Sequence, residues 1–531
     1  MITKRILPLG LLLFVVQLSF GQTSINTFQN PVLKGFYPDP SVCRVGEDYY
    51  LATSSFEYFP GVPVFQSKDL VNWRQIGHCL TRKSQVDLTQ TMTSDGVWAP
   101  TLRHHEGTFY MVASKVTRSP WNPINFYVTA INPAGPWSEP VVVEQGAEIG
   151  IDPDLFFDDD GKVYYLRNDS RGIVIAEIDI LTGKLMSPFR AVWAGTGAPY
   201  PEAPHIHKRE GYYYLIIAEG GTGPYQRESV ARSENIMEGY KAYAHNPILN
   251  HTMRANHVIQ CTGHADFVQT PEGEWWAFFL GKRSTYFEGF NSVLGREVFM
   301  APVTWTSDDW PIIGSGGFVE EEMKAPNIKS YEWEDTPSRD EFNAPELGLQ
   351  WNYLRNPVEN NYTLSKEKGK LILMGSSLNL SDGMSPTFVG RRQQHFNCEA
   401  TVQLAFDTHV ENEEAGLSIF MDKDHHYEIF LTFRDKKRVI AVRRTIGSLS
   451  SVTKYNVIDG YSAELRIVAG TKSYELQYKA GDSFVALDSG ETKYLEAPQY
   501  TGAYFGMYAT GNGEDCKTDA VFDWFEYKEV K

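Results

Sequence analysis

The apolar and polar positions of the N-terminal part of the chain repeat one unit: a short apolar segment, a turn that ends in glycine, and an aromatic-rich strand. The unit occurs five times, and no long apolar stripe of helical period lies between its copies. A glycine turn between alternating or aromatic runs is typical of a β-hairpin. Five such hairpins predict a five-bladed β-propeller, with a β-sandwich of similar hairpins as the alternative. The turn glycines are Gly46, Gly107, Gly161, Gly211 and Gly273.

The register of the units favours the propeller. In four units nine residues separate a polar or aromatic residue from the turn glycine. In the first unit the separation is seven, which a hairpin two residues shorter explains. Blades in equal register bring equivalent positions to one end of the central axis. The repeat therefore predicts that five side chains converge there: Asp39, Trp98, Asp152, Glu202 and His264.

The C-terminal part of the chain has a different pattern. After Trp310 come a glycine-rich segment, a charged run and a linker-like stretch, which place a domain boundary near residue 330. Beyond it, apolar and polar residues alternate with period two, and Gly and Asp turns separate the runs. Such alternation predicts a β-sandwich. We therefore expect an all-β protein with a propeller at residues 22–330 and a sandwich at residues 331–531.

The first residues resemble a targeting segment rather than part of a domain. Lys4 and Arg5 precede a largely apolar stretch, residues 6–20, which ends beside Gly21. This order is typical of a secretory signal. Fifteen residues are too few to span about 30 Å of hydrocarbon. We expect residues 1–21 to be a cleaved signal peptide, the mature protein to be secreted or periplasmic, and no segment to span a membrane.

Charge excludes one class of partner. The chain has 49 Lys and Arg against 66 Asp and Glu, a net charge of −17. An acidic surface repels phosphate backbones, so we expect no nucleic-acid partner. The oligomeric state has no signature in the sequence.

Convergent carboxylates indicate a reaction. Two carboxyl groups that face each other across a small pocket can hydrolyse a glycoside, one as a proton donor and the other as a base or nucleophile. A third acid nearby raises the proton affinity of the donor by like-charge repulsion. Two alternatives remain open from the residues alone. The acids could form a divalent-metal site, or they could cap turns at the start of inner strands.

Several motifs, in order along the chain, resemble glycoside hydrolase family 43, and most closely its β-xylosidases and α-L-arabinofuranosidases. The C-terminal part resembles the concanavalin-like β-sandwich (jelly-roll) domain of this family's xylosidases. The resemblance covers nearly the whole mature chain. The motifs lie at residues 30–41, 55–61, 67–73, 96–100, 201–205, 262–266 and 294–297, and those of the C-terminal part at 502–506 and 523–527.

The resemblance assigns catalytic roles. Asp39 falls on the family's general base, Glu202 on its general acid, and Asp152 on the acid that tunes and orients the proton donor. The resemblance also implies inversion at the anomeric carbon. Inversion needs room for a water, so we expect the carboxyl groups of Asp39 and Glu202 to lie about 6.5–9.5 Å apart.

The resemblance adds four substrate-binding candidates. Arg296 matches an arginine that reaches sugar hydroxyls, with a structural salt bridge as the alternative. Phe56 and Trp98 match aromatic walls of the subsite for the terminal sugar, with core packing as the alternative. His264 matches a histidine that in several relatives contacts a hydrated calcium through water, although a lone buried histidine is more often a core residue. We expect no required cofactor, with a structural calcium near His264 as a possibility.

Together these observations predict an inverting exo-glycosidase that releases terminal β-D-xylosyl residues from xylo-oligosaccharides of plant cell-wall polysaccharides. An α-L-arabinofuranosidase or a bifunctional enzyme acting on arabino-oligosaccharides is the alternative. A non-catalytic glycan-binding propeller is the hypothesis from another class, and the presence of all three acids argues against it. The sandwich could wall the active-site mouth or act as a separate carbohydrate-binding module.

Overall fold

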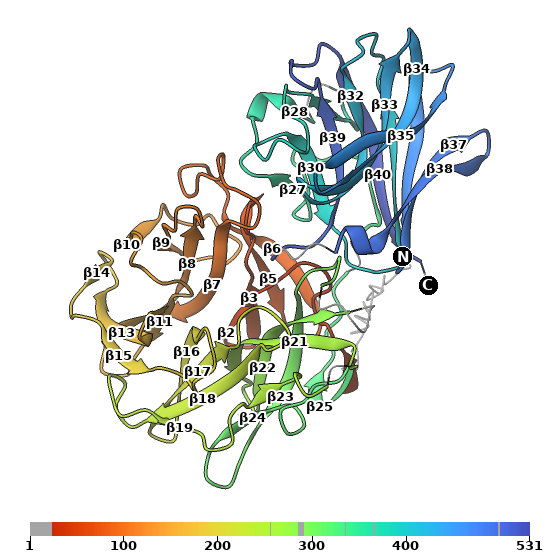
Figure 1. The fold of residues 1–531 in the computed structure, drawn as a ribbon. Coiled ribbons are helices and arrows are strands. Elements are labelled where there is room, and N and C mark those ends of the chain that lie inside the picture. Colours follow the sequence, from red (N-terminus) through yellow and green to blue (C-terminus); the bar gives the residue numbers. More distant parts are fainter. Residues whose placement is uncertain are drawn as a thin grey trace, which may run out of the picture.

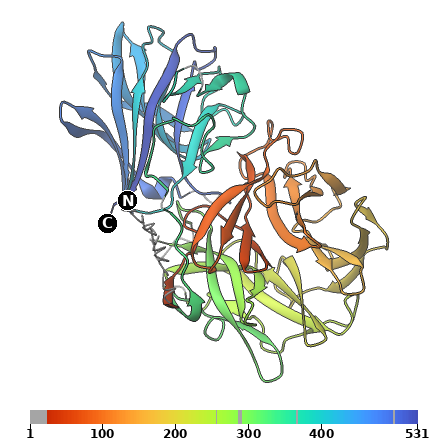
Figure 2. The ribbon, with the colours of Figure 1, turned by 180° about the vertical axis from the view of Figure 1, so that it is seen from behind.

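The computed structural model describes residues 24–254, 256–284, 291–334, 336–364, 367–496 and 500–530. These residues form strands and two single-turn 3-10 helices, η1 (Glu359–Asn361) and η2 (Thr492–Tyr494). Two β domains lie side by side, the propeller at the red-to-green part of the chain and the sandwich at the blue part (Figures 1 and 2). No helix in the described ranges has the length or apolar character needed to cross a membrane. The predicted signal peptide, residues 1–21, lies outside the described residues.

The N-terminal domain is the predicted five-bladed propeller, because five antiparallel sheets of four or five strands follow one another in chain order. Each predicted glycine turn joins the first two strands of a blade, and Gly107 and Gly211 adopt the left-handed φ values of 78° and 81°. The strands of the first two blades are β2 (Ser41–Val45), β3 (Asp48–Ala52), β5 (Gly61–Ser67) and β6 (Trp73–Leu80), then β7 (Gly96–His105), β8 (Thr108–Val116), β9 (Ile124–Ala130) and β10 (Val141–Gln145).

The last three blades continue the same meander. They consist of β11 (Asp154–Phe157), β12 (Val163–Asp169), β13 (Gly172–Asp179), β14 (Lys184–Leu185) and β15 (Arg190–Trp193); β16 (Glu202–Arg209), β17 (Tyr212–Glu219), β18 (Arg227–Ser233), β19 (Lys241–Ala242) and β20 (Leu249–Asn250); and β21 (Ile259–Gln269), β22 (Trp275–Arg283), β23 (Glu297–Trp305) and β24 (Pro311–Ile313).

Apolar side chains hold neighbouring blades together. Each consecutive pair of blades shares a buried cluster, and the cluster between the fifth and first blades closes the ring by packing Trp276 and Phe278 against Tyr49 and Leu51. Burying side chains of this size contributes about 1.5–3 kcal/mol each. A two-stranded ribbon of β1 (Ser24–Gln29) and β25 (Glu322–Lys329) joins the two ends of the propeller sequence. The aromatic strands after the turn glycines thus serve mainly as blade core.

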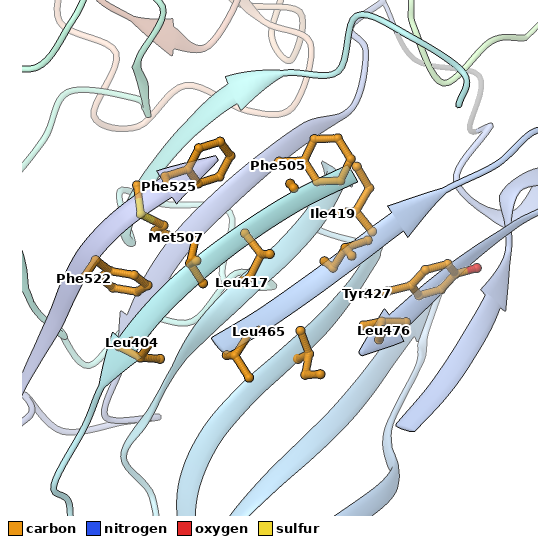
Figure 3. Packing of buried hydrophobic residues seen from close by; sticks show 14 of the residues in the cluster. Leu404, Leu417, Ile419, Tyr427, Leu465, Leu476, Phe505, Met507, Phe522 and Phe525 are labelled. Carbon is orange, nitrogen blue, oxygen red and sulfur yellow. The ribbon is translucent and has the colours of Figure 1, made fainter. Parts of the chain in front are cut away.

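The C-terminal domain is a sandwich of two eight-stranded antiparallel sheets. Alternate residues of both sheets meet in one apolar core, where Leu417 and Met507 lie close to Phe522 and Phe525 (Figure 3). The first sheet contains β28 (Tyr362–Thr363), β29 (Leu371–Met374), β40 (Asp519–Glu529), β31 (Cys398–Ala405), β36 (Ser462–Ala469), β37 (Ser473–Ala480), β38 (Ser483–Glu491) and β26 (Arg339–Asp340). The second contains β35 (Leu449–Val457), β34 (Lys437–Ile446), β33 (His425–Arg434), β32 (Glu414–Asp422), β39 (Tyr504–Thr510), β30 (Thr387–Arg392), β27 (Asn352–Leu354) and β4 (Tyr58–Phe59).

The two domains share a sheet. Strand β4 belongs to the first-blade segment of the sequence but pairs with β27, so that Tyr58 lies opposite Leu354. The rings of Tyr58 and Tyr504 stack with centroids 4.0 Å apart in a buried cluster that also contains Phe56. The chain passes from the propeller to the sandwich between Lys329 and Arg339, and the predicted boundary, residue 330, lies in this segment. The sandwich is therefore fixed against the side of the propeller that carries Phe56.

Candidate active site

A small pocket, with a cavity volume of about 100 Å³, opens where the innermost strands of the blades begin. All five blades contribute to it, and so does the sandwich. The seven side chains singled out from the sequence all line this pocket, together with four residues that were not predicted. The lining consists of Asp39, Phe56, Trp98, Ala99, Ile151, Asp152, Glu202, Thr222, His264, Arg296 and Tyr500.

The backbone kinks where each innermost strand reaches the pocket. Asp39, Asp152 and His264 have φ values of 55–57°, in the left-handed region. In the second and fourth blades the left-handed residue is instead Ala99 or Ala203, the residue after Trp98 or Glu202. The equal register predicted from the sequence is thus displaced by one residue in two blades. Bulges shift the pairing of β7 with β8 at Ala99, of β16 with β17 at Ala203 and of β21 with β22 at His264. The displacement follows the length of the turn, because the paired strands leave two residues for the turn in the second and fourth blades and five in the third and fifth.

Both oxygens of the Asp39 carboxylate are held. Nη1 of Arg296 donates to Oδ1 at 2.6 Å, and Oγ of Ser54 donates to Oδ2 at 2.6 Å. Nδ1 of His264 lies 3.5 Å from Oδ1. Asp39 is 4% exposed. A charge-assisted pair of this length fixes the orientation of a carboxylate that faces the pocket.

Burial and neighbouring negative charges raise the pKa of the other two acids. Burial raises the pKa of Glu202 well above its usual value, and the negative charges of Asp152 and Asp39 raise it further, while Arg296 opposes them. Burial, followed by the charge of Asp39, raises the pKa of Asp152 to about 7. Because these groups interact strongly, they share their protons as a cluster. One pocket thus contains a carboxyl group whose pKa is raised, Glu202, and a carboxylate paired with arginine, Asp39, which is the asymmetry that acid–base hydrolysis of a glycoside requires.

Asp152 also touches the backbone that carries Glu202. Its Oδ2 accepts a hydrogen bond from the N–H of Ala203 at 3.1 Å, and Ala203 directly follows Glu202. The same carboxyl can therefore both change the proton affinity of Glu202 and fix its position.

Three aromatic rings form one wall of the pocket. The ring centroids of Phe56, Trp98 and Tyr500 lie 5.5–6.1 Å apart. Phe56 is buried, and Trp98 is partly exposed with its Nε1–H bound to the carbonyl of Ser94 at 3.1 Å. Phe56 thus supports the wall from behind, while Trp98 presents more of its ring surface.

Of the four lining residues that were not predicted, Tyr500 is the one from the sandwich. Its N–H donates to Oγ of Ser94 at 3.3 Å and its carbonyl accepts from Nη2 of Arg296 at 3.3 Å. The motif at residues 502–506 begins two residues after it and does not include it, and the alternative in which the sandwich walls the mouth was the other available signal. The sandwich therefore completes the pocket.

Arg296 forms a salt bridge at the pocket. Arg296 is 4% exposed, pairs with Asp39 and lines the pocket. Its guanidinium centre lies 5.4 Å from the ring of Phe56. The salt bridge therefore belongs to the site itself and not to a distant structural contact.

His264 is buried at 7% exposure, and burial lowers its pKa to about 4 despite the nearby charge of Asp39. The carboxylates next on the axis, Asp154 and Asp266, both bind the guanidinium of Arg103, at 3.0 and 2.7 Å. Within the described ranges no three His, Cys, Asp or Glu side chains are grouped to hold a metal. Since Arg103 occupies the available carboxylates, the residues around His264 do not fit direct coordination of calcium.

Comparison with known proteins agrees with the geometry. The family model described as glycosyl hydrolases family 43 matches residues 28–311, and the β-xylosidase C-terminal concanavalin A-like domain matches residues 339–528. The chain is 41% identical to a non-reducing end α-L-arabinofuranosidase, BoGH43B, of Bacteroides ovatus, over 98% of both chains. It is 36% identical to a xylan 1,3-β-xylosidase of a Vibrio species, over 95% of this chain and 99% of the relative.

Solved structures show the same architecture. The GH43B protein of the Bacteroides ovatus xyloglucan locus superimposes with a TM-score of 0.91, at 41% identity, over 95% of this chain and all of that one. A xylan β-1,4-xylosidase of Bacillus halodurans superimposes with a TM-score of 0.90, at 34% identity, over 94% of this chain and all of that one. The chain belongs to glycoside hydrolase family 43 and is an exo-glycosidase of the β-xylosidase and α-L-arabinofuranosidase type.

Proposed function

We propose that this enzyme removes a terminal pentose from oligosaccharides with inversion at the anomeric carbon, and that α-L-arabinofuranosyl residues are its first substrate class. The observation that carries the proposal is the pairing of a protonated Glu202 with an arginine-bound Asp39 in one pocket. Glu202 donates a proton to the leaving oxygen, and Asp39 takes a proton from the attacking water.

Asp152 supports the proton donor, and the aromatic wall holds the sugar. The charge of Asp152 favours the protonated form of Glu202. The hydrogen bond that Asp152 accepts from the N–H of Ala203 fixes the backbone beside Glu202. Trp98 and Tyr500 offer ring faces to the apolar face of a pentose. The small pocket and the contribution of the sandwich favour exo action, since a chain end fits where the middle of a polysaccharide does not.

The choice of sugar rests on the relatives. The relative that is 41% identical along 98% of both chains is named a non-reducing end α-L-arabinofuranosidase, which favours arabinofuranose. The β-D-xylosyl residue expected from the sequence is the second candidate. It is supported by the name of the relative at 36% identity and by that of the matched C-terminal domain. Both pentoses offer similar hydroxyl patterns to one pocket.

One pair of substrates tests the proposal. We expect p-nitrophenyl α-L-arabinofuranoside to be hydrolysed with a higher kcat/KM than p-nitrophenyl β-D-xyloside, and the first-formed anomer, observed by proton NMR, to be inverted. The Asp39→Asn variant is the control for contaminating activity. Negligible hydrolysis of both substrates would favour a glycan-binding propeller instead.

We also propose that the enzyme acts after export, because residues 4–21 follow the pattern of a signal peptide. N-terminal sequencing of the protein recovered from outside the cytoplasm tests this proposal. A start near residue 22 is expected, and an intact Met1 would contradict it.

A further inference from the structure

Ser54 is a buried residue that no catalytic role yet includes. It lies between the end of β3 and Phe56, and none of its surface is exposed. Its Oγ is 2.6 Å from Oδ2 of Asp39 and 2.6 Å from the backbone nitrogen of Ala99. Its own N–H donates to the carbonyl of Pro38 at 3.0 Å.

The direction of the hydroxyl bond is fixed by chemistry. The amide of Ala99 can only donate, so it uses a lone pair of the Ser54 oxygen. The single hydroxyl hydrogen is then free to point at Asp39. Oδ2 of Asp39 therefore receives a donor whose orientation is set by the second blade, while Oδ1 receives Nη1 of Arg296.

We propose that Ser54 is a positioning residue that aims the carboxylate of Asp39 at the attacking water. This inference rests on the function proposed above, in which Asp39 is the general base. Without the hydroxyl, Asp39 keeps a donor on one oxygen alone and gains freedom to rotate about its terminal bond.

The same hydroxyl ties the base to the aromatic wall. The segment of Ser54 and Phe56 pairs with β7, because Phe56 and Val97 exchange backbone hydrogen bonds of 2.9 and 3.0 Å. A Cβ on Gly96 would lie 2.2 Å from the carbonyl oxygen of Phe56, so this close pairing requires glycine there. The bond from Ala99 to Ser54 then joins the strand that carries Trp98 to Asp39. The positions of Asp39 and of Trp98 in the aromatic wall are thus set by the same hydrogen-bonded segment.

Removing the hydroxyl has two separable effects. Loss of aim lowers kcat, and loss of a donor raises the proton affinity of the Asp39 carboxylate. Hydrogen bonds to charged groups are strong enough to shift the acidic limb of the pH profile upward by about 1 unit. The other groups that face Asp39 are unchanged by the substitution: Arg296, His264, Asp152 and Glu202.

The experiment compares Ser54→Ala with Ser55→Ala. Ser55 is an adjacent buried serine whose Oγ accepts the N–H of Val62 at 3.1 Å and is not bonded to Asp39. We expect Ser54→Ala to lower kcat about 10- to 100-fold, to change KM less than threefold, and to raise the acidic limb of kcat/KM. We expect Ser55→Ala to keep the wild-type kcat and acidic limb. Ser54→Cys, which donates only weakly, is expected to fall between the two and serves if Ser54→Ala does not fold.

Two results would overturn the inference. One is a Ser54→Ala enzyme with kcat within twofold of wild type and an unmoved acidic limb. The other is an equal loss in Ser55→Ala, which would mean a purely structural role for both serines. A wild-type protein that hydrolyses neither arylglycoside would overturn the proposed function and this inference with it. If the wild-type enzyme is active and Ser54→Ala changes neither kcat nor the acidic limb, this inference alone is overturned.

Discussion

Oδ2 of Asp152 lies 3.1 Å from the backbone nitrogen of Ala203, the residue that follows Glu202. The third acid of the pocket is therefore bonded to the very segment whose proton affinity it changes. This relationship separates two functions of Asp152, because an amide side chain can keep the hydrogen bond but not the charge.

Asp152→Asn should move the alkaline limb of the pH–rate profile to lower pH. The charge of Asp152 is the largest contribution after burial to the raised pKa of Glu202, so its removal makes Glu202 lose its proton earlier. Above the new pKa the donor is ionised and activity falls. The measurement is kcat against pH for both enzymes. An alkaline limb that stays in place would show that Asp152 acts on Glu202 through position alone.

Glu202→Gln and Asp39→Asn should differ in their response to the leaving group. A proton donor matters least when the leaving group is already a weak base, so Glu202→Gln should lose about 10²–10⁴-fold on natural oligosaccharides and much less on a dinitrophenyl glycoside. Asp39→Asn should lose activity on both substrates, because water must still be activated. The comparison needs kcat/KM for each variant with each substrate. Equal losses for Glu202→Gln on both would contradict its role as the acid.

The propeller could be predicted because each blade repeats the same local sequence pattern, a glycine turn followed by an aromatic-rich strand. A hairpin turn needs a left-handed residue, and Gly107 and Gly211 mark two such turns directly. Once the blades were counted, the register brought Asp39, Asp152 and Glu202 together. The one-residue displacement at Glu202 could not be predicted, because the paired strands leave two residues for the turn in the fourth blade and five in the third, and the spacing to the glycine is nine in both.

The contacts between the two domains could not be predicted in this way, because no local sequence pattern marks them. Tyr500 is bonded to Ser94, 406 positions away in the sequence, and no pattern around either residue predicts this contact. Strand β4 has two residues, too few for an alternating pattern, yet it adds Tyr58 to a sheet of the sandwich. The proposed role of Ser54 could not be predicted from the sequence either, because it depends on contacts with Asp39 and Ala99, which come from different blades.

Tyr500→Ala should weaken substrate binding more than it slows the chemistry. The ring packs 5.5 Å from Trp98, whereas the bond to Arg296 uses the backbone carbonyl and survives the substitution. Loss of one aromatic contact of about 1.5 kcal/mol corresponds to roughly a tenfold rise in KM. Tyr500→Phe keeps the ring and is the matched control. If Tyr500→Ala had the same KM as wild type, the Tyr500 side chain would line the pocket without contacting the substrate.

Chelation should leave the activity unchanged. The guanidinium of Arg103 pairs with both Asp154 and Asp266, so a positive charge already lies between these carboxylates on the axis. Activity with either arylglycoside is measured before and after exhaustive treatment with a chelator, and bound calcium is measured by elemental analysis. A loss of activity that added calcium restores would show that a hydrated ion is held near His264 after all.

Glu57 should make the domain interface less stable at neutral pH than at mildly acidic pH. Its carboxyl is 1% exposed, and burial raises its pKa to about 7, although Arg355 and the N–H of Ser94 oppose the shift. An acid whose folded pKa is raised stabilises the fold while protonated, and this stability is lost as the pH rises from the unfolded value of 4.5 to about 7. The loss amounts to at most about 3 kcal/mol.

Glu57→Gln removes that titration and keeps one acceptor for Ser94. The difference in Tm between Glu57→Gln and wild type should therefore increase from pH 5 to pH 8 in favour of the variant, because the variant no longer buries a charge. Measuring the difference at each pH cancels the other acids of the pocket, which titrate in both proteins. A difference that is constant across this range would mean that Glu57 stays charged in the folded protein and is paired with Arg355 throughout.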